Sequence, residues 1–187
     1  MLQSVYHCSE ISGLKLIKPN KSTHGAEYVY ATKEIGISAL FLSGVGGDFT
    51  CAIGRDRQTG MIYVCERFEG AFEYRYSGKS GSIYVLPGEK FKENKTRWIE
   101  EVVADEAIEP NEEIFVSDSK DFLLDLDEKS QIKIVGYPEK IDGIPEDDSD
   151  LVESVIYWTK KFGKEQLDNV RKYHPHLLTR VLKEVEK

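Results

Sequence analysis

The stretches VYHCS at residues 5–9 and EYVYAT at residues 27–32 decide the fold of this chain. Both are short and rich in β-branched and aromatic residues, which is typical of β-strands. A polar turn around Gly13 separates them, and the helix-like segment 33–42 follows the second stretch. This order of strand, loop, strand and helix surrounds a candidate pocket, into which the end of each strand can direct a side chain.

Length, composition and charge indicate one soluble domain. The 187 residues are 40% hydrophobic and 31% charged, which excludes the disordered, collagen-like and membrane classes. A single domain of this length buries roughly 70% of its unfolded surface. The chain has a net charge of -8 and a pI near 5.1, so its long-range electrostatic field repels phosphate backbones. Nucleic acid is therefore not an expected partner.

The cysteine pattern predicts neither a disulfide framework nor a metal site. Three widely spaced thiols without a CxxC pair are typical of reduced cysteines in a cytoplasmic protein, and here they are Cys8, Cys51 and Cys65. The histidines at positions 24, 174 and 176 do not change this expectation. The first twenty residues show no basic segment before an apolar run, and no stretch approaches eighteen apolar residues. We expect a cytoplasmic protein that binds no metal and no membrane.

The first two thirds of the chain consist of short alternating segments separated by glycine, asparagine and aspartate, which predicts strands and turns. Residues 49–53 and 61–68 flank a polar segment and predict an antiparallel hairpin. The glycine-rich run at 44–47 lacks the Lys-Ser/Thr ending of a phosphate loop and predicts a turn. Further strands are predicted at 82–87, 97–104 and 131–137.

The last fifty residues predict helices. Apolar residues recur there at spacings of four, three and four, which places on one helical face Leu151, Val155, Trp158 and Phe162. Asp150 and Glu153 fit a capping-box variant at the start of this helix, and Gly163 fits its end. We predict an α+β core over residues 1–137 and a helical C-terminal extension over residues 138–187, packed together as one domain.

The motifs YHCS at residues 6–9, Gly13-Leu14 and YVYAT at residues 28–32, followed by a helix, resemble the N-terminal half of the ADP-ribosyltransferase superfamily. The resemblance is to its diphtheria-toxin-like and poly-ADP-ribose-polymerase-like branch, and it covers roughly residues 3–110. That branch binds NAD in a cleft of a split antiparallel β-sheet. Its first strand ends in a His-Gly-Ser-like motif, a later strand carries a Tyr-x-Ala-like motif, and a third contributes a glutamate.

The resemblance implies roles for residues of the first motif. His7 resembles the histidine that hydrogen-bonds a ribose hydroxyl, and Ser9 matches the serine two positions later. Cys8 replaces the usual glycine, but the groups used there are the backbone N–H and C=O, which a cysteine also has. His24 is a further binding candidate at the mouth of the cleft.

The resemblance also implies roles for the second and third motifs. Tyr30 resembles the tyrosine that packs against the nicotinamide ring, and Ala31 and Thr32 follow it along the NAD site. The segment RWIEEVVAD resembles the strand from which the catalytic glutamate reaches the cleft. Strand alternation directs Glu100 and Glu101 to opposite faces, so periodicity alone does not choose between them. We favour Glu100, because its spacing to Ile108 fits the family pattern better.

These residue types fit one reaction. Cleavage of the bond between nicotinamide and ribose develops positive charge on the sugar, which a carboxylate stabilises. The tyrosine ring holds the leaving group and the histidine orients the ribose, so no metal is required. The expected substrate is NAD, while the pattern names neither an acceptor for ADP-ribose nor an oligomeric state.

Two other functions stay open. A catalytically inactive binding or structural module of the same fold is the alternative, and it is favoured if Arg97 takes the place of Glu100. A relative of the RNA 2'-phosphotransferases is the third. Such enzymes need arginines around an RNA phosphate, whereas Tyr6 precedes His7 where a basic residue is expected, and the chain is acidic.

Overall fold

The computed structural model describes residues 2–21, 26–42, 44–96 and 98–185. The contacts group the chain into two compact units, each built from two separate segments. Unit 1 contains residues 1–44 and 76–131, and unit 2 contains residues 45–75 and 132–187. The boundary expected after residue 137 does not coincide with this division, because the strand formed by residues 133–135 pairs within unit 2.

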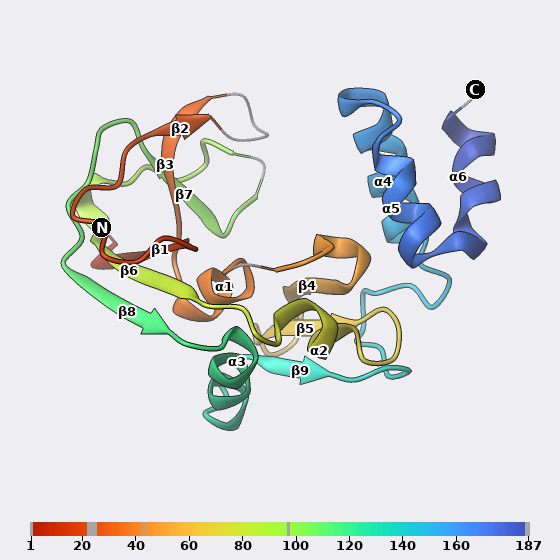
Figure 1. Ribbon diagram of the computed structural model, residues 1–187, viewed down its shortest axis with the longest axis horizontal. Coiled ribbons are helices and arrows are strands. Elements are labelled where there is room, and N and C mark those ends of the chain that lie inside the picture. The colour runs from red at the N-terminus through yellow and green to blue at the C-terminus, as the bar shows by residue number, and fades with distance from the viewer. Residues whose placement is uncertain (1, 22–25, 43, 97, 186–187) are drawn as a thin grey trace. The chain divides into compact units, whose positions relative to one another are not determined.

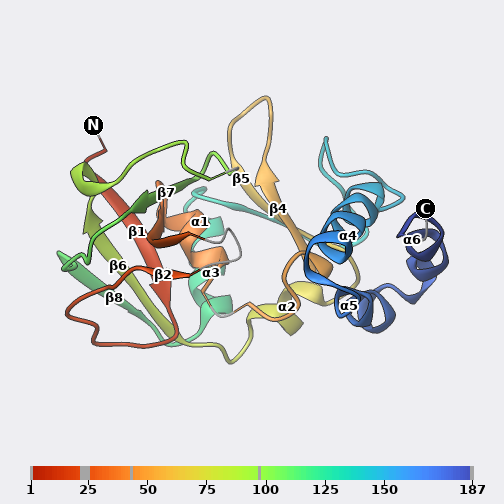
Figure 2. The same ribbon diagram turned by 90° about the horizontal axis from the view of Figure 1, so that it is seen from above.

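Unit 1 is built on an antiparallel sheet in which the strand order differs from the chain order (Figures 1 and 2). The order is β2-β3-β1-β6-β8, and β7 also pairs with β3. The strands are β1 (Ser4–Ser9), β2 (Asn20–Lys21), β3 (Glu27–Thr32), β6 (Gly81–Pro87), β7 (Glu101–Ala104) and β8 (Glu112–Val116). An α+β fold with an antiparallel sheet is therefore confirmed.

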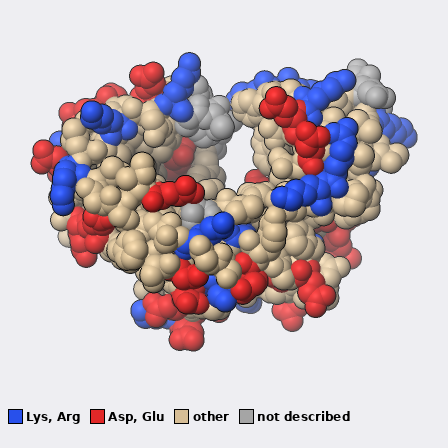
Figure 3. Space-filling view, in the orientation of Figure 1, with Lys and Arg blue, Asp and Glu red and all other residues tan. Residues whose placement is uncertain are grey.

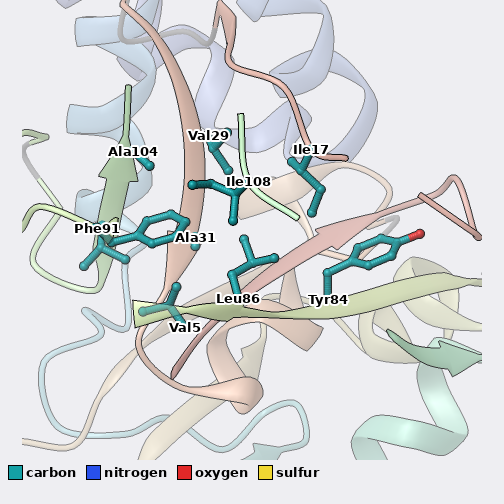
Figure 4. Close-up of a cluster of buried hydrophobic side chains, with 10 residues drawn as sticks. Val5, Ile17, Val29, Ala31, Tyr84, Leu86, Phe91, Ala104 and Ile108 are labelled. Carbon is teal, nitrogen blue, oxygen red and sulfur yellow. The ribbon is translucent and has the colours of Figure 1, made fainter. Parts of the chain in front are cut away.

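One face of this sheet carries an apolar cluster (Figure 4). Alternation directs every second residue of each strand to this face. Ile17 and Ile108 form an antiparallel bridge from the loops and pack into the same cluster. Its buried members are Val5, Ile17, Val29, Ala31, Tyr84, Leu86, Phe91, Val102, Ala104 and Ile108.

Helix α1 (Ile35–Leu40) packs on the opposite face of the sheet, and α3 (Ser119–Glu128) packs against α1. The short α1 contacts β1, β3 and β6. The N-terminus of α3 is capped by Asp118, whose carboxylate accepts bonds from the backbone N–H groups of Lys120 and Asp121. A 3-10 turn at Gly88–Lys90 follows β6.

Unit 2 combines a small sheet with a helical cluster. Strand β5 pairs antiparallel with β4 and parallel with β9. The helices bury a shared apolar stripe that includes Leu151, Val155 and Val181. The elements are β4 (Cys51–Arg55), β5 (Ile62–Glu66), β9 (Lys133–Val135), α4 (Ser149–Phe162), α5 (Gln166–Tyr173) and α6 (Leu178–Val185), with 3-10 turns at Gly47–Phe49 and Pro175–Leu177; α2 (Ala71–Tyr76) lies where the chain passes from unit 2 to unit 1.

A buried arginine connects the segments of unit 2. Arg67 is 6% exposed, and its Nε donates to the carbonyl of Asp48 at 2.6 Å. Its Nη1 donates to Asp148 at 3.0 Å and its Nη2 to Asp150 at 2.7 Å. These charge-assisted bonds join the end of the hairpin to the start of α4, a contact between residues about eighty positions apart.

Several predicted boundaries need correction. The helix expected over residues 33–42 is limited to Ile35–Leu40, and the hairpin strand expected at 49–53 begins at Cys51 because a 3-10 turn precedes it. The capping box expected at Asp150 is wrong. Helix α4 begins at Ser149 after Asp148, and the Asp150 carboxylate binds Arg67.

No helix within the described part of the chain is both long and apolar enough to cross a membrane.

Leu86 tests the apolar cluster of unit 1. Its side chain is fully buried, so Leu86→Ala removes contacts and leaves a cavity. The substitution is expected to lower the free energy of unfolding by about 2–5 kcal/mol, measured by urea denaturation. Leu124→Ala is the matched control, because that side chain on α3 is 41% exposed. A loss at Leu86 no larger than at Leu124 contradicts the assignment of this core.

Candidate functional site

The strands that carry the predicted site residues are consecutive neighbours in the sheet. His7 lies on β1 and Tyr30 on β3, and Glu100 directly precedes β7. Strand β3 pairs with β1 on one side and with β7 on the other. The structure thus brings three segments together, although Glu100 is seventy residues from Tyr30 in the chain.

The backbones of β1 and β3 are paired at one position, Tyr6 with Thr32. Beyond it, the imidazole of His7 bridges the strands, with Nδ1 2.7 Å from the carbonyl oxygen of Tyr30. A carbonyl oxygen only accepts hydrogen bonds, so Nδ1 carries the proton. Burial lowers the pKa of His7, although the bond to Tyr30 opposes this effect. The ring is therefore neutral at pH 7, and Nε2 holds a lone pair.

The side chain of Tyr30 lies on a different face from that of His7. Val29 and Ala31 belong to the apolar cluster, so alternation directs Tyr30 to the opposite face. Its hydroxyl donates to the carbonyl of Ala26 at 2.7 Å, and its ring contacts that of Tyr28 edge-on. His7 therefore contacts the backbone of Tyr30, and the Tyr30 hydroxyl bond fixes the orientation of the ring.

Glu100 lies in a turn just before β7 and is 9% exposed. Its carbonyl accepts a bond from the Lys33 N–H at 3.3 Å, which extends the pairing of β3 and β7 by one residue. Strand β7 begins at the next residue, Glu101, so Glu100 itself lies outside the alternating strand. Glu101 pairs with Thr32, and because Val102 belongs to the apolar cluster, Glu101 is directed to the opposite face.

The other predicted binding residues that the structure describes lie on β1 and β3, the two strands that are paired at one position only. Burial raises the pKa of Cys8 to about 11, so its thiol is not a nucleophile at neutral pH. Ser9 Oγ accepts a bond from the Ile11 N–H at 3.1 Å, and Thr32 Oγ1 donates to the Glu34 carbonyl at 3.1 Å. Ala31 is buried in the apolar cluster. The predictions for His24 and Arg97 fall outside the described residues.

A hydrogen-bond network on β6 and β8 was not predicted. His7 is opposite Tyr84, and Tyr84 is opposite Glu113, so the three lie in one row across β1, β6 and β8. The Tyr84 hydroxyl, which points away from the cluster in Figure 4, donates to the Ile11 carbonyl at 2.8 Å and lies 3.2 Å from Glu113 Oε1. The same oxygen accepts bonds from Gly13 N–H and Ser82 Oγ, each at 2.7 Å.

This network holds the loop that follows the His7 strand. The Leu14 N–H also donates to the Tyr84 hydroxyl at 3.0 Å, so both ends of the turn around Gly13 are attached to the sheet. Alternation within NEEIFV at residues 111–116 was the available signal for Glu113, but it does not reveal which strand is the neighbour.

An open cavity of about 410 Å³ lies beside this loop, lined by Leu14, Lys15 and residues 109–113. Acidic and basic side chains are interspersed over the face of unit 1 drawn in Figure 3. This face offers no continuous basic surface to a nucleic-acid backbone.

No family model, curated protein or solved structure matches this chain. The functional inference therefore depends on the residues and their geometry.

Glu113 predicts a specific pH dependence. The N–H of Gly13, the hydroxyl of Ser82 and that of Tyr84 hold the pKa of Glu113 below its ordinary value of 4.5. A lowered pKa stabilises the folded state above the unfolded value, and this contribution is lost as pH falls through the folded pKa. Wild type should therefore be more stable than Glu113→Gln above pH 4.5, and the difference should shrink below it.

Thermal unfolding of both proteins from pH 3 to pH 7 measures this difference. Glu112→Gln is the control, because its side chain is exposed on the same strand. A difference that stays constant with pH, or that is equal for both variants, contradicts the role of the Glu113 carboxylate.

Proposed function

We propose that unit 1 is an NAD-dependent ADP-ribosyltransferase-like enzyme, which cleaves the bond between nicotinamide and ribose and transfers ADP-ribose to an acceptor. The observation that carries the proposal is the adjacency of β1, β3 and β7, the strands associated with His7, Tyr30 and Glu100. The order of these short motifs along the sequence does not by itself make their strands neighbours in the sheet. The adjacency of these strands supports one ribose site formed by the side chains of His7 and Glu100 and by the backbone of Tyr30.

His7 orients the ribose in this proposal. Its Nδ1 proton is engaged by the Tyr30 carbonyl, so Nε2 is left to accept a hydrogen bond from a ribose hydroxyl. The lowered pKa keeps that lone pair free of a proton at neutral pH. Because the imidazole is attached to the neighbouring strand, little rotational freedom is lost when the sugar binds.

Glu100 stabilises the charge that develops on the ribose as nicotinamide leaves. One strand separates β7 from β1, so their backbones are about 10 Å apart, twice the spacing of adjacent strands. The side chains of His7 and Glu100 can then contact the same sugar from two sides. The low exposure of Glu100 strengthens its electrostatic effect, because water screens a buried carboxylate less.

The expected role of the Tyr30 ring does not fit this site, because the ring is directed to the face opposite His7; Tyr30 contributes its carbonyl, which holds Nδ1 of His7. The backbone of Cys8, directly after His7, supplies N–H and C=O groups for the carboxamide. The expected substrate is NAD. The ADP-ribose group is then transferred to an acceptor, of which water is the simplest.

Release of nicotinamide from NAD tests this function. Glu100→Gln keeps the size of the side chain and removes its charge, so the rate should fall by about 10²-fold or more. His7→Ala should lower the rate as well, because the ribose is no longer held. Glu101→Gln is the matched control, since this strand residue is directed to the face opposite His7.

Circular dichroism and thermal unfolding establish that the variants fold. If wild type releases no nicotinamide and NAD does not shift its melting temperature, the proposed function is wrong. If Glu101→Gln loses as much activity as Glu100→Gln, the function stands but the assignment of the catalytic carboxylate is wrong.

A further inference from the structure

In unit 2, two histidines and an aspartate converge. One side-chain nitrogen each from His174 and His176, and one carboxylate oxygen from Asp148, lie within 4.8 Å of one another. The three residues come from the start of α4 and from the segment after α5. The sequence pattern predicted no metal site, because Asp148 is separated from the histidines by more than twenty residues.

The environment of His174 is that of a metal ligand. The side chain is 2% exposed, and its Nε2 lies 2.6 Å from the carbonyl oxygen of Phe49. A carbonyl only accepts, so Nε2 carries the proton and Nδ1 holds the lone pair. Ligating histidines commonly donate their second N–H to a backbone carbonyl in this way, which fixes the tautomer and the ring orientation.

His176 and Asp148 complete the set from two sides. The His176 ring contacts the His174 ring edge-on, with centroids 5.8 Å apart, and it is exposed to solvent. Asp148 is buried, and its Oδ1 accepts a bond from Arg67 at 3.0 Å. A hydrogen bond of this kind orients a ligating carboxylate and leaves the second oxygen for an ion.

The surrounding charges are balanced before any ion binds. Asp148 and Asp150 face the cations Arg67 and Lys140, and Lys140 Nζ lies 3.5 Å from Asp148 Oδ1. The Asp150 carboxylate neutralises Arg67 through Nη2. Lys140 is thus the cation that competes with a metal ion for Asp148.

We propose that Asp148, His174 and His176 bind a divalent transition-metal ion of the Zn²⁺ type. Two imidazoles and one carboxylate suit zinc better than calcium or magnesium, which prefer oxygen ligands. Three protein ligands leave a fourth tetrahedral position for water or another small ligand. The site is independent of the proposed reaction with NAD.

Titration of the tag-free, chelator-treated chain with Zn²⁺ and with Co²⁺ tests the site. Calorimetry should give one ion per chain, and Co²⁺ should give the visible absorption of a four-coordinate site. His176→Ala should weaken Zn²⁺ binding by about tenfold or more. Because the His176 ring is exposed, this substitution is not expected to disturb folding. Asp168→Asn, an exposed carboxylate on α5 outside the cluster, is the matched control and should bind like wild type.

Lys140→Gln tests the role of Asp148 as a metal ligand without removing the bond between Asp148 and Arg67. Removal of the competing ammonium should tighten Zn²⁺ binding several-fold, and unchanged or weaker binding overturns the role of Asp148. The proposal as a whole is overturned if wild type binds no ion at equimolar stoichiometry, or if His176→Ala binds as tightly as wild type. The second result would place the ion elsewhere on the chain.

Discussion

The bond from His7 Nδ1 to the Tyr30 carbonyl is the constraint on which the candidate site depends. A sheet normally satisfies its backbone carbonyls from the neighbouring strand, but β1 and β3 pair at Tyr6 and Thr32 and then separate. A side chain supplies the missing donor, so the strands stay neighbours without a continuous ladder. The same bond determines which nitrogen of His7 can serve a ligand.

A second constraint organises the other unit, and it is also a buried polar group. Arg67 binds a carbonyl before β4 and two carboxylates at the start of α4. Removing one partner from such a cluster leaves a buried charge uncompensated, which costs several kcal/mol. The orientation of Asp148 therefore depends on the same guanidinium, and the carboxylate that faces His174 and His176 is held by a residue far away in the chain.

Local patterns predict part of this molecule well. The alternation in VYHCS and EYVYAT places β1 and β3 correctly, and the apolar spacing after residue 150 places α4. Strand order is not a local property, so neither the adjacency of β3 and β7 nor the row from His7 to Glu113 follows from periodicity. The start of α4 was missed for a similar reason, because a contact with Arg67 takes the carboxylate that a capping pattern assigns to the helix. The cluster at His174 depends on the packing of segments that the sequence separates.

The discontinuity of the two units has a consequence for the order in which the protein is made. The ribosome releases β1 and β3 first, but their partners β6, β7 and β8 follow the hairpin of unit 2 in the chain. The sheet that holds His7 cannot close until about residue 116 has emerged, and β5 waits longer still for β9. Folding from the N-terminus, the usual course for chains of successive domains, does not apply to this protein. The nascent chain therefore carries an unpaired strand edge until β6, β7 and β8 have been synthesised, a state in which strands are prone to associate with the wrong neighbour.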